Sequence, residues 1–375
     1  MPQVNQVRAK PTGSNPTIDK PTSETAPASR YAFWRRWLLP LLVALTLVSA
    51  WLDLNHGPVE IPFSQWWSLL FGGDGVNPSQ SNIILQLRLP RVLTAVAVGA
   101  ALGGSGAALQ GLFRNPLADP SIIGVSAGAS LGAALAIVAG AHWAIAASVL
   151  PLLQILCAFV AALAVVALVY AVAKPALVGA GRSVITMLLA GIAITALVGA
   201  ATSVLKYLVD DQNLRQVSLW QMGSLQPNSW WLVAVLLLCC ATCLWRLLAA
   251  AESLNAFLLG EADAQLMGVA VARVKLKVIT WVALACAATV AVAGVIGFVG
   301  LLAPHCARLL VGPNHRYLMP CAAVGGALML VLADIVSRSL IPPIILPVGI
   351  ITALVGAPLF LWLLVFSQGA GQWRH

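Results

Sequence analysis

The residues best suited to binding a metal ion in this chain are three neighbouring cysteines, Cys239, Cys240 and Cys243. Their spacing would supply one part of a zinc site, which needs a second group of ligands elsewhere in the sequence. No second group accompanies them, and all seven cysteines lie in or at the ends of apolar segments. Cysteine in such surroundings packs as a small hydrophobic residue. We expect no metal site, no cofactor and no disulfide framework.

Motifs for catalysis are scarce as well. The chain contains no GxxxxGK[ST] phosphate loop and no HExxH metal motif. The Gly-Ser-Gly run at 104–106 lies inside an apolar segment, where glycines serve packing. We therefore expect no catalytic residues, and any energy for work must come from another polypeptide or from an ion gradient.

Charged residues make up 9% of the chain, against about 25% in soluble domains. Two of them, Arg88 and Arg91, stand three residues apart around Pro90, ahead of a run rich in glycine. Ionisable residues in such an apolar chain are costly and usually serve a function. These two arginines are therefore candidate functional residues.

The apolar content predicts an all-α integral membrane protein. Of the 375 residues 60% are hydrophobic, the mean hydropathy is +0.92, and a transmembrane helix needs about 20 apolar residues. We predict about ten transmembrane helices, near residues 37–53, 90–112, 119–140, 144–172, 184–208, 230–250, 276–295, 298–312, 317–338 and 348–367.

Residues 1–34 differ from the rest of the chain. They are polar and rich in Pro, Ser and Thr, which favours disorder, and they lack the pattern of a secretory signal peptide. We predict a disordered cytoplasmic tail over 1–34, a transmembrane domain over 35–367 and a short cytoplasmic tail over 368–375.

The basic residues orient the chain in the membrane. Arg35 and Arg36 precede the first span, which places the N-terminus in the cytoplasm, and ten spans return the C-terminus to the same side. The basic residues that fall on the outer face are Arg88, Arg91, Arg215 and Arg338. Spans two to five and seven to ten would run in opposite directions, as in the inverted repeats of many transporters.

Acidic residues deep in the spans are almost absent. Carriers driven by an ion gradient normally need such residues. Asp334 comes closest, and Arg338 follows it by about one helical turn, so an intrahelical ion pair explains it. A proton-coupled carrier is disfavoured, whereas a sodium site made of backbone carbonyls stays open.

The loop between the sixth and seventh spans, residues 252–275, contains a candidate docking segment at 258–269. Apolar and polar positions mix there as in a short amphipathic helix, with glycines as stops. The residues are Leu258, Leu259, Gly260, Glu261, Asp263, Gln265, Leu266, Met267 and Gly268. Such a helix suits a groove on a partner protein. The alternative is a helix lying on lipid, which its acidic face disfavours.

Six segments, in order along residues 35–367, resemble the FecCD family of ABC-transporter permeases. They are LRLPR at 87–91, RNPLADPSIIGVSAGA at 114–129, LLGEADAQLMGV at 258–269, GVIGFVGLLAPHCARLLVGPNHR at 294–316, ADIVSR at 333–338 and LPVGIITALVGAPLFLWLL at 346–364. Members of this family import iron–siderophores, haem and vitamin B12.

The resemblance implies a permease of the type II importer fold in the inner (plasma) membrane, and not an enzyme. It implies a homodimer with the transport path along its two-fold axis, two copies of a cytoplasmic ATPase and an external substrate-binding protein. We expect no binding of nucleic acid. The resemblance also makes the segment 258–269 the element that couples to the ATPase.

The resemblance assigns a role to the outer arginines. In this family, arginines at the positions of Arg88, Arg91 and Arg338 pair with glutamates of the binding protein. A dimer would present six such charges on its outer face. Exposed ion pairs contribute only about 0–1 kcal/mol each, so the main effect would be on the rate of docking.

Residues of the path or its gate are expected in the glycine-rich second and third spans, in the turn between them and at the mouth of the fifth span. They are Gly106, Gln110, Asn115, Ser126, Gly128 and Arg215. Arg215 could meet carboxylates of a ligand. The alternative is that it pairs with Asp210 or Asp211 and caps the helix.

The choice of ligand depends on the resemblance alone. The segments 111–126 and 207–225 look most like the haem-importing branch, so haem is favoured, a ferric siderophore is second and vitamin B12 third. The five histidines do not decide the ligand. The rival class is a secondary carrier driven by an ion gradient. A structural or receptor protein would leave the docking segment and the outer arginines unexplained.

Overall fold

The computed structural model describes residues 28–57, 78–143, 145–146, 148–177, 183–226 and 229–369. Within these ranges the chain is helical apart from turns, short connections and one isolated β-bridge. Eight of the described helical segments are long and apolar enough to cross a membrane, and two further apolar stretches, 299–311 and 348–363, are shorter. The predicted all-α membrane fold is confirmed. Residues 1–27 and 370–375, which hold most of both predicted tails, lie outside the described residues.

The helices begin and end close to the predicted spans. In chain order they are α1 (Ala28–Asn55), α3 (Pro78–Asn82), η1 (Ile83–Arg88), α4 (Leu89–Phe113), η2 (Pro120–Ile123), α5 (Val125–His142), α6 (Leu150–Leu177), α7 (Ser183–Leu208), α8 (Asp211–Gln221), α9 (Trp230–Leu248), α10 (Ala251–Phe257), α11 (Glu261–Leu266), α12 (Val271–Ala293), α13 (Val299–Val311), α14 (His315–Ser339) and α15 (Val348–Gly369). The first helix starts well ahead of residue 37, and the short polar helix α8 was not predicted.

One predicted span is too short to cross the membrane alone. Helix α13 has 13 residues, which is about 20 Å at 1.5 Å per residue, against a hydrocarbon core of about 30 Å. Two residues with positive φ, Gly294 and Phe298, bound the connection that ends α12 and reverses the chain. The helix predicted at 298–312 is present as α13, and at this length it crosses only part of the membrane.

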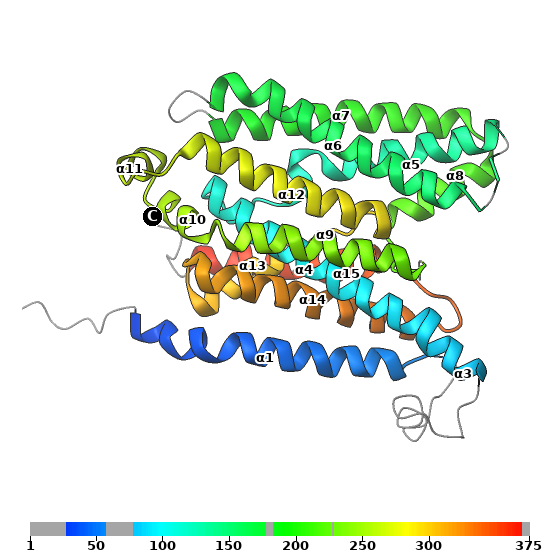
Figure 1. Cartoon of the computed structure of the whole chain (residues 1–375), viewed down its shortest axis with the longest axis horizontal. Helices are drawn as coiled ribbons and strands as arrows, with labels where there is room; N and C mark the ends of the chain where they lie inside the picture. Colours follow the sequence, from blue (N-terminus) through cyan, green and yellow to red (C-terminus); the bar gives the residue numbers. More distant parts are fainter. Residues whose placement is uncertain are drawn as a thin grey trace, which may run out of the picture.

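Helix α4 runs through the middle of the bundle, with α6 and α7 along one edge and α1 along the opposite edge (Figure 1). Glycines allow its central position, because a Cβ at Gly99 or Gly103 would overlap backbone atoms of α14 at Gly326 or Ala322. Small residues at such crossings let helix backbones approach closely in lipid. The glycine-rich second span is thus the hub on which the other helices pack.

The start of α4 carries both arginines of the LRLPR segment and is irregular. A π-helical turn, η1, ends two residues before Pro90. Proline has no N–H to donate and its ring crowds the carbonyl four residues earlier, so a widened turn is a common solution at this point. The segments α3, η1 and α4 form one continuous helical rod from Pro78 to Phe113.

The bundle has two distinct ends. One end carries α8, the start of the Pro78–Phe113 rod and the C-terminal end of α1, and we call it the α8 end. The opposite end carries α10, α11 and the N-terminal end of α1, and we call it the α11 end (Figure 1). The predicted docking segment and the predicted outer arginines therefore lie at opposite ends, as the topology required.

Candidate functional site

The predicted docking segment projects from the α11 end on a buried base. Leu254 and Phe257 of α10 are fully buried, and α10 packs on α4 and α14. Gly260, with a φ of 127°, then turns the chain outward, and Gly268, with a φ of 85°, ends the excursion. Only glycine adopts such angles at little cost. The two predicted glycine stops are confirmed.

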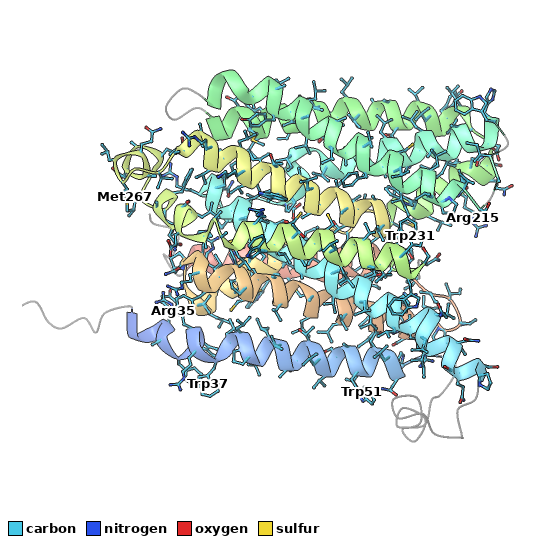
Figure 2. The ribbon with its side chains drawn as sticks, viewed as in Figure 1. Arg35, Trp37, Trp51, Arg215, Trp231 and Met267 are labelled. Carbon is cyan, nitrogen blue, oxygen red and sulfur yellow. The ribbon has the colours of Figure 1, made fainter. Side chains whose placement is uncertain are left out.

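The tip of this segment presents apolar side chains that nothing in the described structure covers. Leu259 and Met267 are each 64% exposed and Leu266 is 87% exposed. Met267 lies at the extreme of the α11 end (Figure 2). Of helix α11 only Ala264 is fully buried, which gives the short helix the amphipathic character that the sequence predicted. Apolar groups held out from a protein in this way are typical of a contact surface.

A salt bridge that the sequence did not reveal supports α11. Lys275 Nζ donates to Glu261 Oε2 at 2.7 Å, and the lysine side chain is only 4% exposed. Glu261 therefore faces the protein, whereas Asp263 and Gln265 are exposed. The predicted acidic docking face is reduced to the side of α11 that bears Asp263.

Polar contacts fix α10 to the start of α14. The Asn255 side chain accepts from the backbone N–H of His315 at 2.8 Å, and its amide donates to Asn314 at 3.0 Å. Asn314 in turn caps α14 by accepting from Arg316 N. The two contacts of Asn255 connect the base of the docking segment directly to a long core helix.

Two of the predicted path residues are packing contacts within the chain. A Cβ at Gly106 would overlap the carbonyl of Gly300 in α13. Gln110 is buried, and its amide donates to Leu301 O at 3.2 Å while its oxygen accepts from Arg308 at 3.2 Å. Both residues therefore hold α4 against α13.

The other predicted path residues of this region shape the turn and the helix that follow α4. Asn115 accepts from Leu117 N at 2.9 Å, which closes the turn. Gly128 packs on α6, where an added Cβ would lie 2.7 Å from Ala161 O. Ser126 is half-buried near the start of α5. Its Gly-x-Ser-x-Gly surroundings match a hydrolase pattern, but they follow the turn η2 and not a strand.

The three outer arginines are not exposed, contrary to the prediction. Arg91 is buried and makes a bidentate contact with the fully buried Asp334, at 2.7–3.0 Å. Arg338 has a side chain only 9% exposed and pairs with Asp53 of α1 and, at 3.5 Å, with Asp334. The predicted Asp334–Arg338 contact is confirmed, and Asp53 is the partner that the sequence did not indicate.

Arg88 completes this cluster. It is buried and donates to Leu54 O at 2.8 Å, and Arg338 donates to the carbonyls of Asp53 and His56 at 2.9 Å. All three arginines thus bind the C-terminal end of α1 or the core of α14. We call Asp53, Arg88, Arg91, Asp334 and Arg338 the arginine cluster.

Arg215 differs from the arginine cluster because it is exposed. It lies on α8 at the end opposite Met267, at the same end as Trp231 (Figure 2). In the described structure no ion pair joins it to Asp210 or Asp211. Asp210 instead accepts from the Asn213 amide, which lowers the pKa of its carboxyl. Asp210 is thus held by Asn213, and Arg215 stays exposed to solvent.

No group of three or more His, Cys, Asp or Glu side chains with the geometry of a metal site occurs among the described residues. All seven cysteines are free thiols.

Comparison with known proteins decides the family. Residues 44–366 match the model of the FecCD transport family. The chain belongs to the FecCD transport family. A solved relative, a metal-chelate type ABC transporter in an inward-facing conformation, is 34% identical with a TM-score of 0.77 over 88% of this chain and 99% of its own.

Curated relatives agree with this assignment. The chain is 44% identical to the hemin transport system permease protein HmuU of Yersinia pestis, over 88% of this chain and 94% of that protein. It is 36% identical to the vitamin B12 import system permease protein BtuC of Vibrio vulnificus, over 90% of this chain and 96% of that protein.

The family settles the class of protein. This member of the FecCD family is a multi-pass membrane permease subunit of an ABC importer, a class of subunit that is not itself catalytic and that works with ATPases and binding proteins. The rival interpretation as a secondary carrier driven by an ion gradient is thereby excluded.

Proposed function

We propose that this FecCD permease forms the membrane path of an ATP-driven importer of haem. The observation that carries the proposal is the 44% identity with a hemin permease over nearly the whole of both chains. Vitamin B12 permeases share 36% over a similar extent, so B12 is the second candidate by comparison. A ferric siderophore stays an alternative from the sequence motifs.

The α11 end is the cytoplasmic end in this proposal. Basic residues gather there, including Arg35, Arg36 and Arg316 at the starts of α1 and α14 and Arg114 at the end of α4. An excess of Lys and Arg in short loops marks the cytoplasmic side. Helix α1 then begins and α15 ends on the cytoplasmic side, so both termini lie there.

The docking segment is the contact for a cytoplasmic ATPase. Its exposed apolar tip needs a partner with an apolar groove, and the exposed Asp263 favours a basic rim around that groove. The buried base on α10 and the Glu261–Lys275 bridge hold the tip in one orientation. Motion of the ATPase would therefore be transmitted to α12 and α14 rather than absorbed in a loose loop.

The path forms between two copies of the chain. Within one copy, the glycines of α4 bring neighbouring backbones into contact, and most of its residues are buried against other helices. Helices α7 and α15, by contrast, keep exposed apolar faces that include Leu197 and Leu354. Gly106, Gln110, Asn115, Ser126 and Gly128 would then position the helices that border the path.

The binding protein docks at the α8 end. Arg215 is a basic residue of this end that is exposed and can pair directly with an acidic surface. The arginine cluster carries three positive groups against two carboxylates, so it adds a positive field while holding the fold. Direct pairing of Arg88, Arg91 and Arg338 with the binding protein would first require their internal bonds to break.

Transport by purified components tests the ligand. Proteoliposomes containing the chain, its ATPase and its binding protein would be supplied with haem, ferric siderophores or vitamin B12. We expect ATP-dependent uptake of haem alone, and no uptake with an ATPase that cannot hydrolyse ATP. If vitamin B12 or a siderophore were taken up with ATP and haem were not, that compound would be the ligand in place of haem. Uptake that follows an ion gradient and ignores ATP would overturn the proposal.

A further inference from the structure

A cavity of about 430 Å³ lies between α1, α13, α14 and α15. Its walls include Leu38 and Leu42 of α1, Leu310 of α13, Cys321 and Val336 of α14 and Ile351 of α15. We call it the α1 groove. The residues from Cys321 to Val336 extend about 22 Å along α14 at 1.5 Å per residue, so the groove is long as well as narrow.

The lining of the α1 groove offers nothing to a polar ligand. Among the lining residues, Thr352 is the one with a hydroxyl, and that hydroxyl donates to Gly349 O of its own helix at 3.1 Å. The remaining walls are aliphatic, aromatic, thiol or thioether groups. A transported haem or siderophore carries carboxylates or other polar groups, so the groove suits hydrocarbon instead.

Helix α1 is a lipid-facing element at the edge of the bundle. Its Trp37 and Trp51 are 51% and 38% exposed and project away from the neighbouring helices (Figure 2). Exposed tryptophans near both ends of a span mark the two membrane interfaces. The groove behind α1 therefore lies at the depth of lipid acyl chains.

One end of the groove meets a basic site. Leu38 follows Arg35 by one helical turn, Leu310 immediately precedes Val311, and Arg35 Nε donates to Val311 O at 3.1 Å. The Arg35 guanidinium also lies over the rings of Tyr31 and Tyr317, at 5.7 and 5.3 Å. Arg35 thus stands at the point where three lining helices end.

Further positive charge surrounds this end. Arg36 and Arg316 are exposed beside Arg35 and Tyr317 in the chain. Among the described residues no carboxylate forms an ion pair with Arg35, Arg36 or Arg316. A basic site at the end of an apolar groove between helices matches an anionic phospholipid, with its phosphate on the arginines and a chain in the groove.

We propose that the α1 groove binds an acyl chain of an anionic phospholipid whose phosphate contacts Arg35, with Arg36 and Arg316 nearby. The bound lipid fills the space between α1 and the core helices at the level of α13. Helix α1 then depends on lipid at the α11 end and on the arginine cluster at the α8 end. Anionic lipid becomes a structural component of the permease.

Retention of lipid by the full-length protein tests this site. The chain would be purified with equal palmitoyl-oleoyl phosphatidylglycerol and phosphatidylcholine, washed with detergent and weighed by native mass spectrometry. We expect one phosphatidylglycerol to remain per chain in preference to phosphatidylcholine. Arg35→Gln should weaken that preference about fivefold, the equivalent of about 1 kcal/mol for one basic group. Arg246→Gln, an exposed arginine on Trp245 and Trp281 at the same end, should leave it unchanged.

A second pair of variants tests the groove itself. An added Cβ at Gly325 meets only Leu42 Cδ1, at 4.0 Å, so Gly325→Leu fills the groove without a backbone clash. It should abolish retention of the bound lipid. The same change at Gly199, which has no atom within 4 Å, should not. Equal retention of phosphatidylglycerol by the two variants would overturn the proposal. A Gly325→Leu protein that keeps its bound lipid but no longer forms a dimer would also overturn it.

Photolabelling gives an answer even if Gly325→Leu does not fold. Phosphatidylglycerol with a diazirine near the end of one acyl chain should label peptides of α14 between Cys321 and Val336 in the unaltered protein. Phosphatidylcholine with the same group should label them several-fold less. Equal labelling by both lipids, or labelling of α9 in place of α14, would contradict a bound anionic lipid in the groove.

Discussion

Charged side chains are buried in ion pairs at the α8 end of this permease and are mostly exposed in the docking segment at the α11 end. At the α8 end the arginine cluster is closed on itself, with Arg91 on Asp334 and Arg338 on Asp53, all at most 9% exposed in their side chains. At the α11 end Asp263 and Gln265 stay exposed beside uncovered apolar side chains. Only Glu261 of that segment is drawn into an ion pair.

This difference distinguishes charged groups that stabilise the fold from exposed groups that we propose contact a partner protein. Burying an ion pair is costly, and once it is buried the loss of one member leaves the other charge uncompensated. Exposed apolar groups on a rigid support contribute nothing to the isolated chain, yet they are the usual anchors of an interface. Mutations in the arginine cluster at the α8 end should therefore lower the stability of the chain. Mutations at the tip of the α11 end should instead weaken its assembly with a partner.

The largest expected effect is loss of stability at the α8 end. Asp334→Ala removes the carboxylate shared by Arg91 and Arg338 and should lower the free energy of unfolding by about 3–5 kcal/mol. Thermal unfolding of the solubilised protein measures this. Asp263→Ala, an exposed acid at the other end, should change stability by less than about 0.5 kcal/mol. Equal effects of the two changes would remove the distinction between the ends.

The docking tip should show the reverse pattern. Replacing Leu266 and Met267 with Ser removes two exposed apolar anchors and should weaken association with the ATPase by about 2–4 kcal/mol, roughly 30- to 1,000-fold. Co-purification and a binding titration would report it, with the unfolding temperature unchanged. Ala262→Ser, on the same helix and also exposed, is the matched control. Wild-type association of the double variant would show that the tip is not the coupling element.

The Glu261–Lys275 bridge should lie between these extremes. Glu261→Ala leaves the buried Lys275 ammonium without its carboxylate and should cost about 1–3 kcal/mol of stability, with weaker ATPase coupling as a consequence. Exchanging the two residues, Glu261→Lys with Lys275→Glu, should restore much of both. If Glu261→Ala weakens association with the ATPase but leaves the stability of the chain unchanged, Glu261 contacts the ATPase directly and does not act by supporting α11.

The smallest expected effect belongs to Arg215. Arg215→Glu should slow docking of the binding protein by a few-fold, with an effect that fades as salt rises, because exposed pairs contribute about 0–1 kcal/mol. Stopped-flow docking at two salt concentrations measures it. Replacing Arg338 would also reduce docking, but with a fall in unfolding temperature that Arg215→Glu should not show. A fall in stability for Arg215→Glu would place it with the arginine cluster.

Several features could be predicted because they depend on nearby residues. Helix positions follow runs of apolar residues, and the stops at Gly260 and Gly268 follow from a backbone that only glycine adopts easily. The Asp334–Arg338 contact spans one helical turn. The helix predicted at 298–312 matches α13 closely, but the positive φ of Phe298 just before it could not be predicted, because hydropathy carries no signal for a backbone angle.

The sequence by itself determined the membrane class, the apolar helices and the family, because each depends on local composition or on contiguous motifs. Tertiary structure alone decided which charges are exposed. Arg91 meets Asp334 across 243 positions, and Arg338 meets Asp53 across 285. No local pattern encodes such distances. The charges of Arg88, Arg91 and Arg338 were visible in the chain, but whether they face water depends on how closely α1, α4 and α14 pack, and glycine contacts along α4 set that packing.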